Sequence, residues 1–368
     1  MKFTCSQTSL LKAVNMVGRA VSIKTTVPAL KGILLKVEGN ELILTGSDMD
    51  FSVISRIDVV EAEEGSLIVS AKFFSDVVRK LPNAMVKAFS DDKNKLSITC
   101  LDSHFNLVAA SADEYPAIGG ETFGKSFKMN NKVLRNLIGK VSFAASIDEK
   151  KGVLTGCLIK TGNSFVEMVA LDGFRLALAK ESSEVAEKMD IVVPARILNE
   201  ISKLLSENES AQEVDVSIEE KKIRISTSDV TMVSRLLDGE FIRYIDIFPK
   251  MYKTKVIVSR EEFQSSLERA SLFVAEGKNN LIRLKIGEDG IEISSRNDYG
   301  NVNELLPAEL EGDPLEIGFN SRYLMDVIKA VNDEEISLEM TNSLSACVIK
   351  QVENSSYQYL VLPVRLSV

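Results

Sequence analysis

The strongest constraint on the fold of this 368-residue chain is an internal repeat that begins at Phe3, at Phe127 and at Val256. After each of these residues, apolar side chains follow at offsets of 7, 11 and 14. That spacing places them on one face of an amphipathic helix, directly after a short strand. A repeat this long is too large for a solenoid unit, so it predicts three tandem domains.

A second helix recurs in the middle of each third, and alternating strands follow both helices. The apolar spacing predicts these second helices at residues 71–81, 195–207 and 321–333. Each third then reads as two β-α-β-β-β halves, which predicts an α+β fold with two helices packed on antiparallel sheets in every domain. We place the three domains at residues 1–122, 123–249 and 250–368. Duplication for stability alone remains the alternative explanation of the repeat.

Composition excludes several function classes. The chain has one histidine, His104, which argues against Ser-His-Asp and Cys-His catalytic sites and against metal sites that need several histidines. The four cysteines are widely spaced, which favours buried thiols; they are Cys5, Cys100, Cys157 and Cys347. No apolar run approaches the roughly 18–20 residues of a membrane span, and the first residues lack the apolar core of a signal peptide. We therefore expect a non-catalytic cytoplasmic protein with no metal, no cofactor and no membrane partner.

Charge is distributed unevenly between the predicted helices and the rest of the chain. The chain has 44 basic and 53 acidic residues, and this net charge of −9 argues by itself against binding nucleic acid. The predicted helices hold 16 basic and 9 acidic residues, a net charge of +7, so the remainder carries −16. Those helices span residues 6–24, 71–81, 130–140, 195–207, 259–278 and 321–333.

Basic helices beside an acidic remainder suit a polyanion that touches the helical side only. The cations assigned to this nucleic-acid-facing surface are Lys12, Lys24, Lys72, Arg79, Lys80, Lys132, Arg135, Lys140, Lys151, Arg196, Lys203, Arg269 and Lys278.

Helix dimensions limit how such a surface can surround DNA. Helices are roughly 10 Å wide, so six of them side by side enclose a free bore of only ~9 Å, whereas twelve enclose ~28 Å. B-DNA is roughly 20 Å across. One chain is therefore too small to enclose a duplex, and two chains are sufficient. Sheets that continue across the domain joins would leave edges at the chain ends, and head-to-tail pairing of two copies would satisfy those edges.

Short motifs along the whole chain carry a family resemblance. They are Met1–Thr4, Leu10–Lys12, Leu44–Asp48, Ala71–Phe74, Leu171–Ala177, Val193–Pro194, Leu237–Phe241, Ile317–Asn320, Tyr323 and Leu362–Leu366. Through these motifs the sequence resembles the bacterial replicative sliding clamps, the beta subunits of the DNA polymerase III holoenzyme. The resemblance implies a head-to-tail homodimeric ring of six like domains that encircles double-stranded DNA without reading its sequence. It further implies a DNA replication processivity factor that tethers the replicative polymerase and is opened by a separate clamp loader.

The same resemblance implies two sets of protein contacts. A hydrophobic groove between the second and third domains would dock the polymerase and other proteins with a clamp-binding motif. Its residues would be Leu154, Leu171, Gly173, Phe174, Arg175, Leu176, Ile242, Ile247, Asn320, Tyr323, Leu344, Leu360, Val361, Leu362, Pro363 and Arg365. The dimer interface would include Phe105, Leu107, Leu272 and Phe273, with His104 at its rim.

The chain also departs from many relatives in this groove. Phe174 stands where many relatives carry His, and Ile242 stands where many carry Pro. Residues 149–153 read Glu-Lys-Lys-Gly-Val, where some relatives place an Arg and two Tyr. The groove should stay apolar, while peptide preference and any DNA contact near 148–153 are left open.

Two local patterns suggest nucleotide chemistry instead. Residues 119–126 match the phosphate-binding pattern G-x-x-x-x-G-K-S, and 166–172 look like the acidic strand that accompanies it. A phosphate-binding loop needs a helix immediately after it, whereas we predict that 126–129 form the strand that opens the second domain. Asp172 and Arg175 also lack the second acid that acid–base catalysis needs. A nucleotide-hydrolysing enzyme and a protein-only scaffold ring remain the alternatives to a DNA-encircling clamp.

Overall fold

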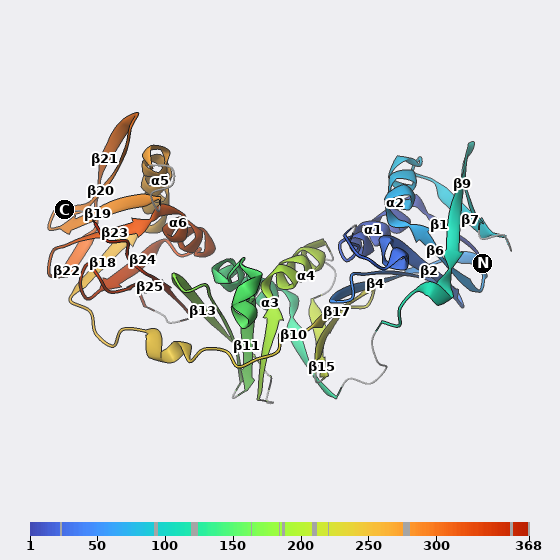
Figure 1. Ribbon diagram of the computed structural model, residues 1–368, viewed down its shortest axis with the longest axis horizontal. Coiled ribbons are helices and arrows are strands. Elements are labelled where there is room, and N and C mark those ends of the chain that lie inside the picture. Colours follow the sequence, from blue (N-terminus) through green and yellow to red (C-terminus); the bar gives the residue numbers. More distant parts are fainter. Residues whose placement is uncertain are drawn as a thin grey trace. The chain divides into compact units, whose positions relative to one another are not determined.

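A computed structural model describes residues 1–22, 24–91, 95–118, 124–162, 164–183, 185, 188–207, 212–219, 221–274, 280–353 and 356–366. The chain divides into two compact units (Figure 1). The first contains Met1–Asn131 and Lys203–Leu236, and the second contains Lys132–Ser202 and Leu237–Val368. We describe each unit by itself.

The first third of the chain has the predicted β-α-β-β-β order twice, with one additional short strand. Its first half consists of β1 (Lys2–Ser6), α1 (Gln7–Gly18), β2 (Gly32–Glu38), β3 (Glu41–Ser47), β4 (Phe51–Asp58) and the additional β5 (Val60–Glu63). Its second half consists of β6 (Gly65–Ser70), α2 (Ala71–Lys80), β7 (Met85–Ser90), β8 (Lys95–Cys100) and β9 (Ser103–Ser111). Helices α1 and α2 lie side by side over these strands (Figure 1).

The other two thirds repeat this order. The second consists of β10 (Lys125–Asn130), α3 (Asn131–Val141), β11 (Gly156–Gly162), β12 (Phe165–Leu171), β13 (Arg175–Ser182), β14 (Met189–Pro194), α4 (Ala195–Glu207), β15 (Glu213–Glu219), β16 (Lys222–Ser226) and β17 (Val230–Arg235). The third consists of β18 (Thr254–Ser259), α5 (Arg260–Ala270), β19 (Leu281–Gly287), β20 (Gly290–Asn297), β21 (Gly300–Leu306), β22 (Glu309–Gly312), β23 (Leu315–Asn320), α6 (Ser321–Ala330), β24 (Glu335–Met340), β25 (Cys347–Gln351) and β26 (Tyr357–Val361).

Three predicted helices were too long, and the one predicted at 321–333 ends at Ala330. The helix predicted at 6–24 ends at Gly18, because the N–H groups of Arg19 and Ala20 bond carbonyls three residues back, at Met16 and Val17. That tighter geometry closes the last turn. The helix predicted at 259–278 ends at Ala270 and passes into a short 3₁₀ turn, Ser271–Phe273.

The predicted apolar stripes form the core. Leu10, Val14 and Val17 are at most 1% exposed, and Phe263 and Leu267 are fully buried. Burying each side chain of this size contributes about 1.5–3 kcal/mol, so the repeated stripe fixes each helix on its sheet. The four cysteines are free and buried, as predicted. Within the described part of the chain, no helix is long and apolar enough to cross a membrane.

The sheets continue across the domain joins. In the first unit, β17 pairs antiparallel with β4, with Val230 opposite Ser55, and the joined sheet has 13 strands. In the second unit, β13 pairs antiparallel with β26, with Arg175 opposite Val361, in a nine-stranded sheet. The predicted continuity is therefore confirmed at both joins. A separate four-stranded sheet in the second unit ends at β21.

The phosphate-loop pattern does not have the required surroundings. Residues 119–123 lie outside the described residues, but its last two residues, Lys125 and Ser126, begin strand β10. No helix N-terminus follows the Gly-Lys-Ser sequence, so nothing there directs a helix dipole and backbone N–H groups at a phosphate.

Helix α1 approaches strand β3 closely at Gly46. A Cβ placed on Gly46 would lie 2.2 Å from the carbonyl oxygen of Val17, whereas a Cβ on Gly18 has nothing within 4 Å. We predict that Gly46→Ala destabilises the first unit by about 1–3 kcal/mol, because backbone must move. Gly18→Ala is the matched control and should be neutral or slightly stabilising. Urea unfolding would measure both, and equal midpoints would contradict this packing.

Candidate docking groove and nucleic-acid surface

A tight turn between β12 and β13 positions the first part of the predicted groove. The carboxylate oxygen Oδ1 of Asp172 accepts the backbone N–H groups of Phe174 at 2.8 Å and Arg175 at 3.0 Å. Gly173 has φ +94°, in the left-handed region that favours glycine. Asp172 is therefore a turn residue, which gives the acidic strand end at 166–172 a structural role. The turn leaves Phe174 53% exposed.

Arg175 connects this turn to helix α6 and to the end of helix α3. Its Nε lies 3.1 Å from Asp172 Oδ2, and one terminal nitrogen bonds the carboxylate of Asp326. Its other terminal nitrogen donates to the carbonyl oxygen of Phe143 at 2.8 Å. The guanidinium carbon also lies 4.7 Å from the ring centroid of Tyr323 and 5.4 Å from that of Phe143. Since all three nitrogens are engaged, Arg175 supports the groove wall.

The exposed wall of the groove is aromatic and aliphatic. The rings of Phe174 and Tyr323 stack with centroids 6.0 Å apart and an interplanar angle of 21°. The N–H of Leu362 donates to the carbonyl oxygen of Phe174 at 2.9 Å, which extends the β13–β26 pairing past its last residue. Leu362 and Leu344 are 40% and 67% exposed. Partial burial and the nearby carboxylate of Asp172 raise the pKa of Tyr323, so its hydroxyl stays protonated near neutral pH.

Several predicted groove residues belong to a buried cluster in the same unit. Leu171, Leu176 and Leu360 pack with Tyr244, and Leu154 lies against them. Ile242 and Ile247, 44% and 41% exposed, belong to the segment that follows strand β17.

Other predicted groove residues have different roles. Val361 is fully buried. The side-chain oxygen of Asn320 accepts the N–H of Arg322 at 3.0 Å and caps helix α6. Pro363 is half-buried and Arg365 is exposed, on either side of Val364, whose N–H donates to Gly318 at 2.8 Å.

Sequence reasoning missed several residues that shape this site. Phe143 and Asp326 hold the guanidinium of Arg175, and Tyr244 belongs to the buried cluster. Asp326 lies three residues after Tyr323 on α6, a spacing that places both on one helix face, so periodicity could have found it. No local signal in the sequence identifies Phe143, because its contribution is a backbone carbonyl.

Lys151, which was predicted to face nucleic acid, contacts the turn between β12 and β13. Its Nζ donates to the carbonyl oxygen of Asp172 at 2.6 Å and lies 5.5 Å from the ring centroid of Phe174. Phe174 belongs to the predicted docking groove, and Asp172 belongs to the turn that positions Phe174.

The observed helices keep the basic character predicted for them. Within their observed bounds the six α-helices hold 13 basic and 7 acidic residues, a net charge of +6. The predicted cations that are exposed on or beside these helices are Lys12, Lys24, Lys72, Arg79, Lys80, Lys132, Arg196, Lys203 and Arg269, and Arg135 is half-buried. Lys278 lies outside the described residues.

Lys140 differs from the other helix cations. Its side chain is 12% exposed, its Nζ lies 3.4 Å from a carboxylate oxygen of Glu181, and it stands 5.4 Å from the ring centroid of Tyr357. Lys140 therefore stabilises the packing of α3 and contributes little to an open basic surface. Arg269 is exposed, but its guanidinium donates two hydrogen bonds of 2.6 Å to the carboxylate of Glu304.

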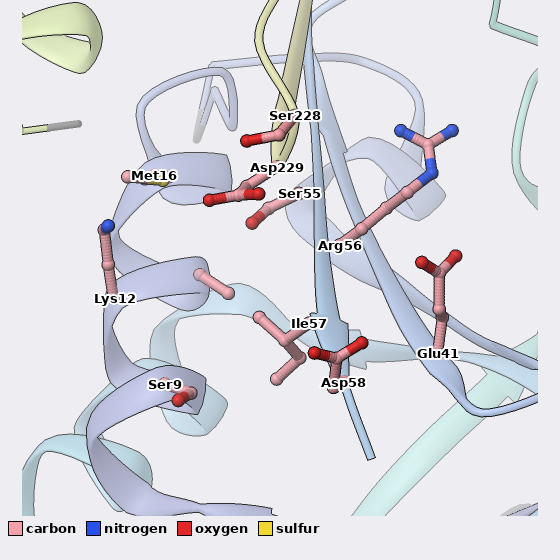
Figure 2. Close-up of a pocket in the computed structure, with 11 residues that line it drawn as sticks. Ser9, Lys12, Met16, Glu41, Ser55, Arg56, Ile57, Asp58, Ser228 and Asp229 are labelled. Atoms are coloured by element: carbon pink, nitrogen blue, oxygen red, sulfur yellow. The ribbon is translucent and has the colours of Figure 1, made fainter. Parts of the chain in front are cut away.

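The surroundings of Lys12 show how the first helix meets its sheet. Figure 2 shows Ser9, Lys12 and Met16 projecting from α1 beside a cavity of about 310 Å³, with Asp58 and Asp229 on its other wall. The lining has three carboxylates against the two cations Lys12 and Arg56, so the cavity does not favour a phosphate in its interior. Lys12 is exposed at its edge, where a polyanion can reach it without entering the cavity.

Of the predicted dimer residues, Phe105 and Leu107 lie on strand β9, whereas Leu272 and Phe273 lie in the 3₁₀ turn Ser271–Phe273, which contacts strand β21. Strand β9 pairs with β8 from Ser103 to Val108, and its other side pairs with β6 only from Ala109 to Ser111. Strand β21 is the last strand of its sheet. Phe105 and Leu272 are 37% and 75% exposed, while Leu107 and Phe273 are half-buried.

Family models cover nearly the whole chain. The N-terminal, central and C-terminal domain models of the DNA polymerase III beta subunit match residues 1–119, 128–242 and 245–365. The chain belongs to the DNA polymerase III beta subunit family. It is 33% identical to the beta sliding clamp of Staphylococcus aureus, with 99% of each chain covered.

Solved structures of the family have the same fold. The sliding clamp of Bacillus subtilis superposes with a TM-score of 0.96 at 33% identity, covering 100% of both chains. A Pseudomonas aeruginosa clamp bound to griselimycin superposes with a TM-score of 0.94 at 28% identity, again over both full chains. This clamp therefore has three tandem clamp domains and is a non-catalytic processivity factor of DNA replication, as the sequence resemblance predicted.

The charge network around Arg175 gives a stability prediction for this clamp. Arg175→Met leaves the carboxylates of Asp172 and Asp326 without their cation, so we expect a loss of about 3 kcal/mol. Arg283→Met removes the exposed pair with Glu316, whose side chains are 48% and 43% exposed, and should cost less than about 1 kcal/mol. Urea unfolding followed by tyrosine fluorescence suits a chain with no tryptophan. Equal losses for the two variants would contradict the role of Arg175.

Proposed function

We propose that two copies of this clamp pair head to tail and enclose duplex DNA in the cytoplasm, at the nucleoid. The observation that carries the proposal is the pair of strand edges, β9 from Ser103 to Val108 and β21, on separate units of the chain. Edges of this kind are satisfied by pairing with another chain. If β9 of each copy pairs with β21 of the other, two equivalent contacts form and close the ring.

Apolar side chains support such a pairing at both edges. On β9, Phe105 and Leu107 share the face of Leu96 and Ile98, because those residues are their cross-strand partners. Phe73 on α2, 61% exposed, adds to the exposed apolar surface of the first domain. On the other edge, Leu272 is exposed, and Phe273 lies against Gly300 at the start of β21.

The DNA contact in this proposal uses helix cations and phosphate groups. Exposed lysines and arginines attract the phosphate backbone of DNA and do not read its bases, so the ring can slide. A contact of this kind is weak and salt-sensitive. The acidic remainder of the chain repels DNA from other surfaces.

The docking groove completes the proposed function. The aromatic pair Phe174–Tyr323, the exposed Leu344 and Leu362, and the buried cluster suit a short peptide with apolar anchors. We assign this groove to the replicative polymerase, the clamp loader and other proteins with a clamp-binding motif.

For the three clamp domains we propose the boundaries 1–122, 123–249 and 250–368.

The dimer contact gives a direct prediction. Phe105→Asp combined with Leu272→Asp places charges on both apolar edges, so we expect dimer affinity to fall at least about 100-fold. Sedimentation equilibrium would measure the change. Ile147→Asp is the control, because Ile147 is fully exposed and belongs to neither β9 nor β21. A dimer unaffected by the double change would contradict the assigned interface.

Topology tests encirclement and separates it from a protein-only scaffold ring. Clamp loaded on nicked circular DNA should stay bound and should dissociate when the circle is cut. If the clamp stays bound equally well after the circle is cut, encirclement is contradicted.

Replacing Lys12, Lys24 and Lys80 by Glu tests the assigned inner surface. The triple change should lower loading or retention, because it reverses charge on the basic surface. The matched control makes the same change to Glu at three lysines that are exposed on strands: Lys36, Lys87 and Lys128. If both triple variants load equally, the inner surface is assigned wrongly.

A further inference from the structure

The cavity between helix α1 and strand β4 has polar groups that the protein leaves unpaired. Its volume is about 310 Å³, which is within the range of sites for small molecules. Helix α1 contributes Ala13 and Met16, strand β4 contributes residues 55–58, and the turn before β17 contributes Ser228 and Asp229 (Figure 2). All of these residues belong to the first unit, so the cavity is complete within it.

The buried hydroxyl group of Ser55 points to a ligand in this cavity. Ser55 is only 2% exposed, and its hydroxyl makes no hydrogen bond with any residue that the structure describes. Figure 2 shows this hydroxyl directed to the end of the cavity where the Asp229 carboxylate and the Ser228 hydroxyl lie. Since a buried polar group without a partner is unfavourable, a ligand that bonds to Ser55 is favoured at this end.

Two carboxylates of the cavity also lack a cation. Within the described part of the chain, neither Asp58 nor Asp229 forms an ion pair, and Lys12 at the edge of the cavity is paired with neither of them. Figure 2 shows Arg56 and Glu41 projecting on the side of β4 away from α1, where their opposite charges offset each other. The interior between α1 and β4 is therefore acidic.

The spacing of these carboxylates suits two ammonium groups on one short chain. The N–H of Arg56 donates to the carbonyl oxygen of Asp229 at 2.9 Å, so Asp229 lies opposite Arg56, and Asp58 is two residues further along β4. With a rise of about 3.3 Å per residue and about 4.8 Å between strands, the two Cα atoms are roughly 8 Å apart. Met16 and Ile57 line the cavity between its two ends and offer apolar surface to methylene groups (Figure 2).

We infer that this cavity binds a short aliphatic diamine, with one ammonium group at Asp229 and the other at Asp58. A primary ammonium group has three N–H donors, and the Asp229 end offers a carboxylate and the hydroxyl oxygens of Ser55 and Ser228 as acceptors. Hydrogen bonds between an ammonium group and a carboxylate are charge-assisted and therefore strong. A bound diamine would neutralise both carboxylates and make this part of the helical side more positive.

NMR of the full-length clamp with carbon-13 labels in its methionine methyl groups tests the inference. Met16 gives a local signal because it lines the cavity and is 2% exposed, and Met16→Leu assigns that signal. Met251, which is 78% exposed and belongs to the second unit, reports binding elsewhere. The ligands are putrescine, which is a four-carbon diamine, n-butylamine, which has one ammonium group on the same chain, and butanediol, which has none.

Putrescine should shift the Met16 signal and leave the Met251 signal unchanged. Its affinity should be about tenfold higher than that of n-butylamine, because it makes a second charge-assisted contact. Butanediol should cause no shift. Asp58→Asn and Asp229→Asn should each lower the affinity for putrescine to about that of n-butylamine. Asp289→Asn is the matched control and should change nothing, because it removes an exposed carboxylate from the turn between β19 and β20.

A Met16 signal that putrescine does not shift would overturn the inference. A shift of the same size and affinity in the Asp58→Asn and Asp229→Asn variants would overturn it as well. Equal affinity for putrescine and n-butylamine in the unchanged clamp would indicate a site for a single ammonium group, such as a lysine side chain of a partner, and would contradict a diamine site. Unchanged signals of the other methionines in each variant verify that its fold is intact.

Discussion

Backbone pairing between domains is the constraint on which the rest of this structure depends. Strand β17 of the second third adds to β4 of the first, and β13 adds to β26 of the third. Each join converts two exposed edges into a continuous ladder, whose N–H and C=O groups would otherwise need water or another chain. Once these joins are made, the partly unpaired β9 and the terminal β21 are among the edges that a second copy can satisfy.

The join between β13 and β26 also positions residues of the proposed docking groove. The pairing continues to Leu362, whose N–H reaches the carbonyl of Phe174, so the ladder that connects the domains also brings Leu362 to the Phe174 turn. Arg175 then fixes the wall by bonding Asp172, Asp326 and the carbonyl of Phe143. Because these bonds use every guanidinium nitrogen, a substitution at Arg175 should act on the shape of the groove, whereas one at Lys151 should act on its charge.

Periodicity predicted the helices and their buried faces well, since Leu10, Val14 and Val17 had to lie together whatever the tertiary fold. The direction of single cations could not be predicted in this way. Lys140 is on a basic helix, but it turns to Glu181 and Tyr357, which come from distant strands. Lys151 is held by a carbonyl oxygen and an aromatic ring, and neither leaves a charge pattern in the sequence. The lengths of the helices at Gly18 and Ala270 depended on local hydrogen bonds that apolar spacing does not report.

Hydrogen–deuterium exchange at the two proposed edges tests the central claim most directly. If β9 and β21 pair between copies, the amides of residues 103–108 and 300–306 exchange slowly in the concentrated clamp. Dilution below the dimer dissociation constant should then speed exchange at both edges together, while the amides of the internal β13–β26 join stay protected. Equal exchange at both edges at all concentrations would contradict a ring closed by these strands.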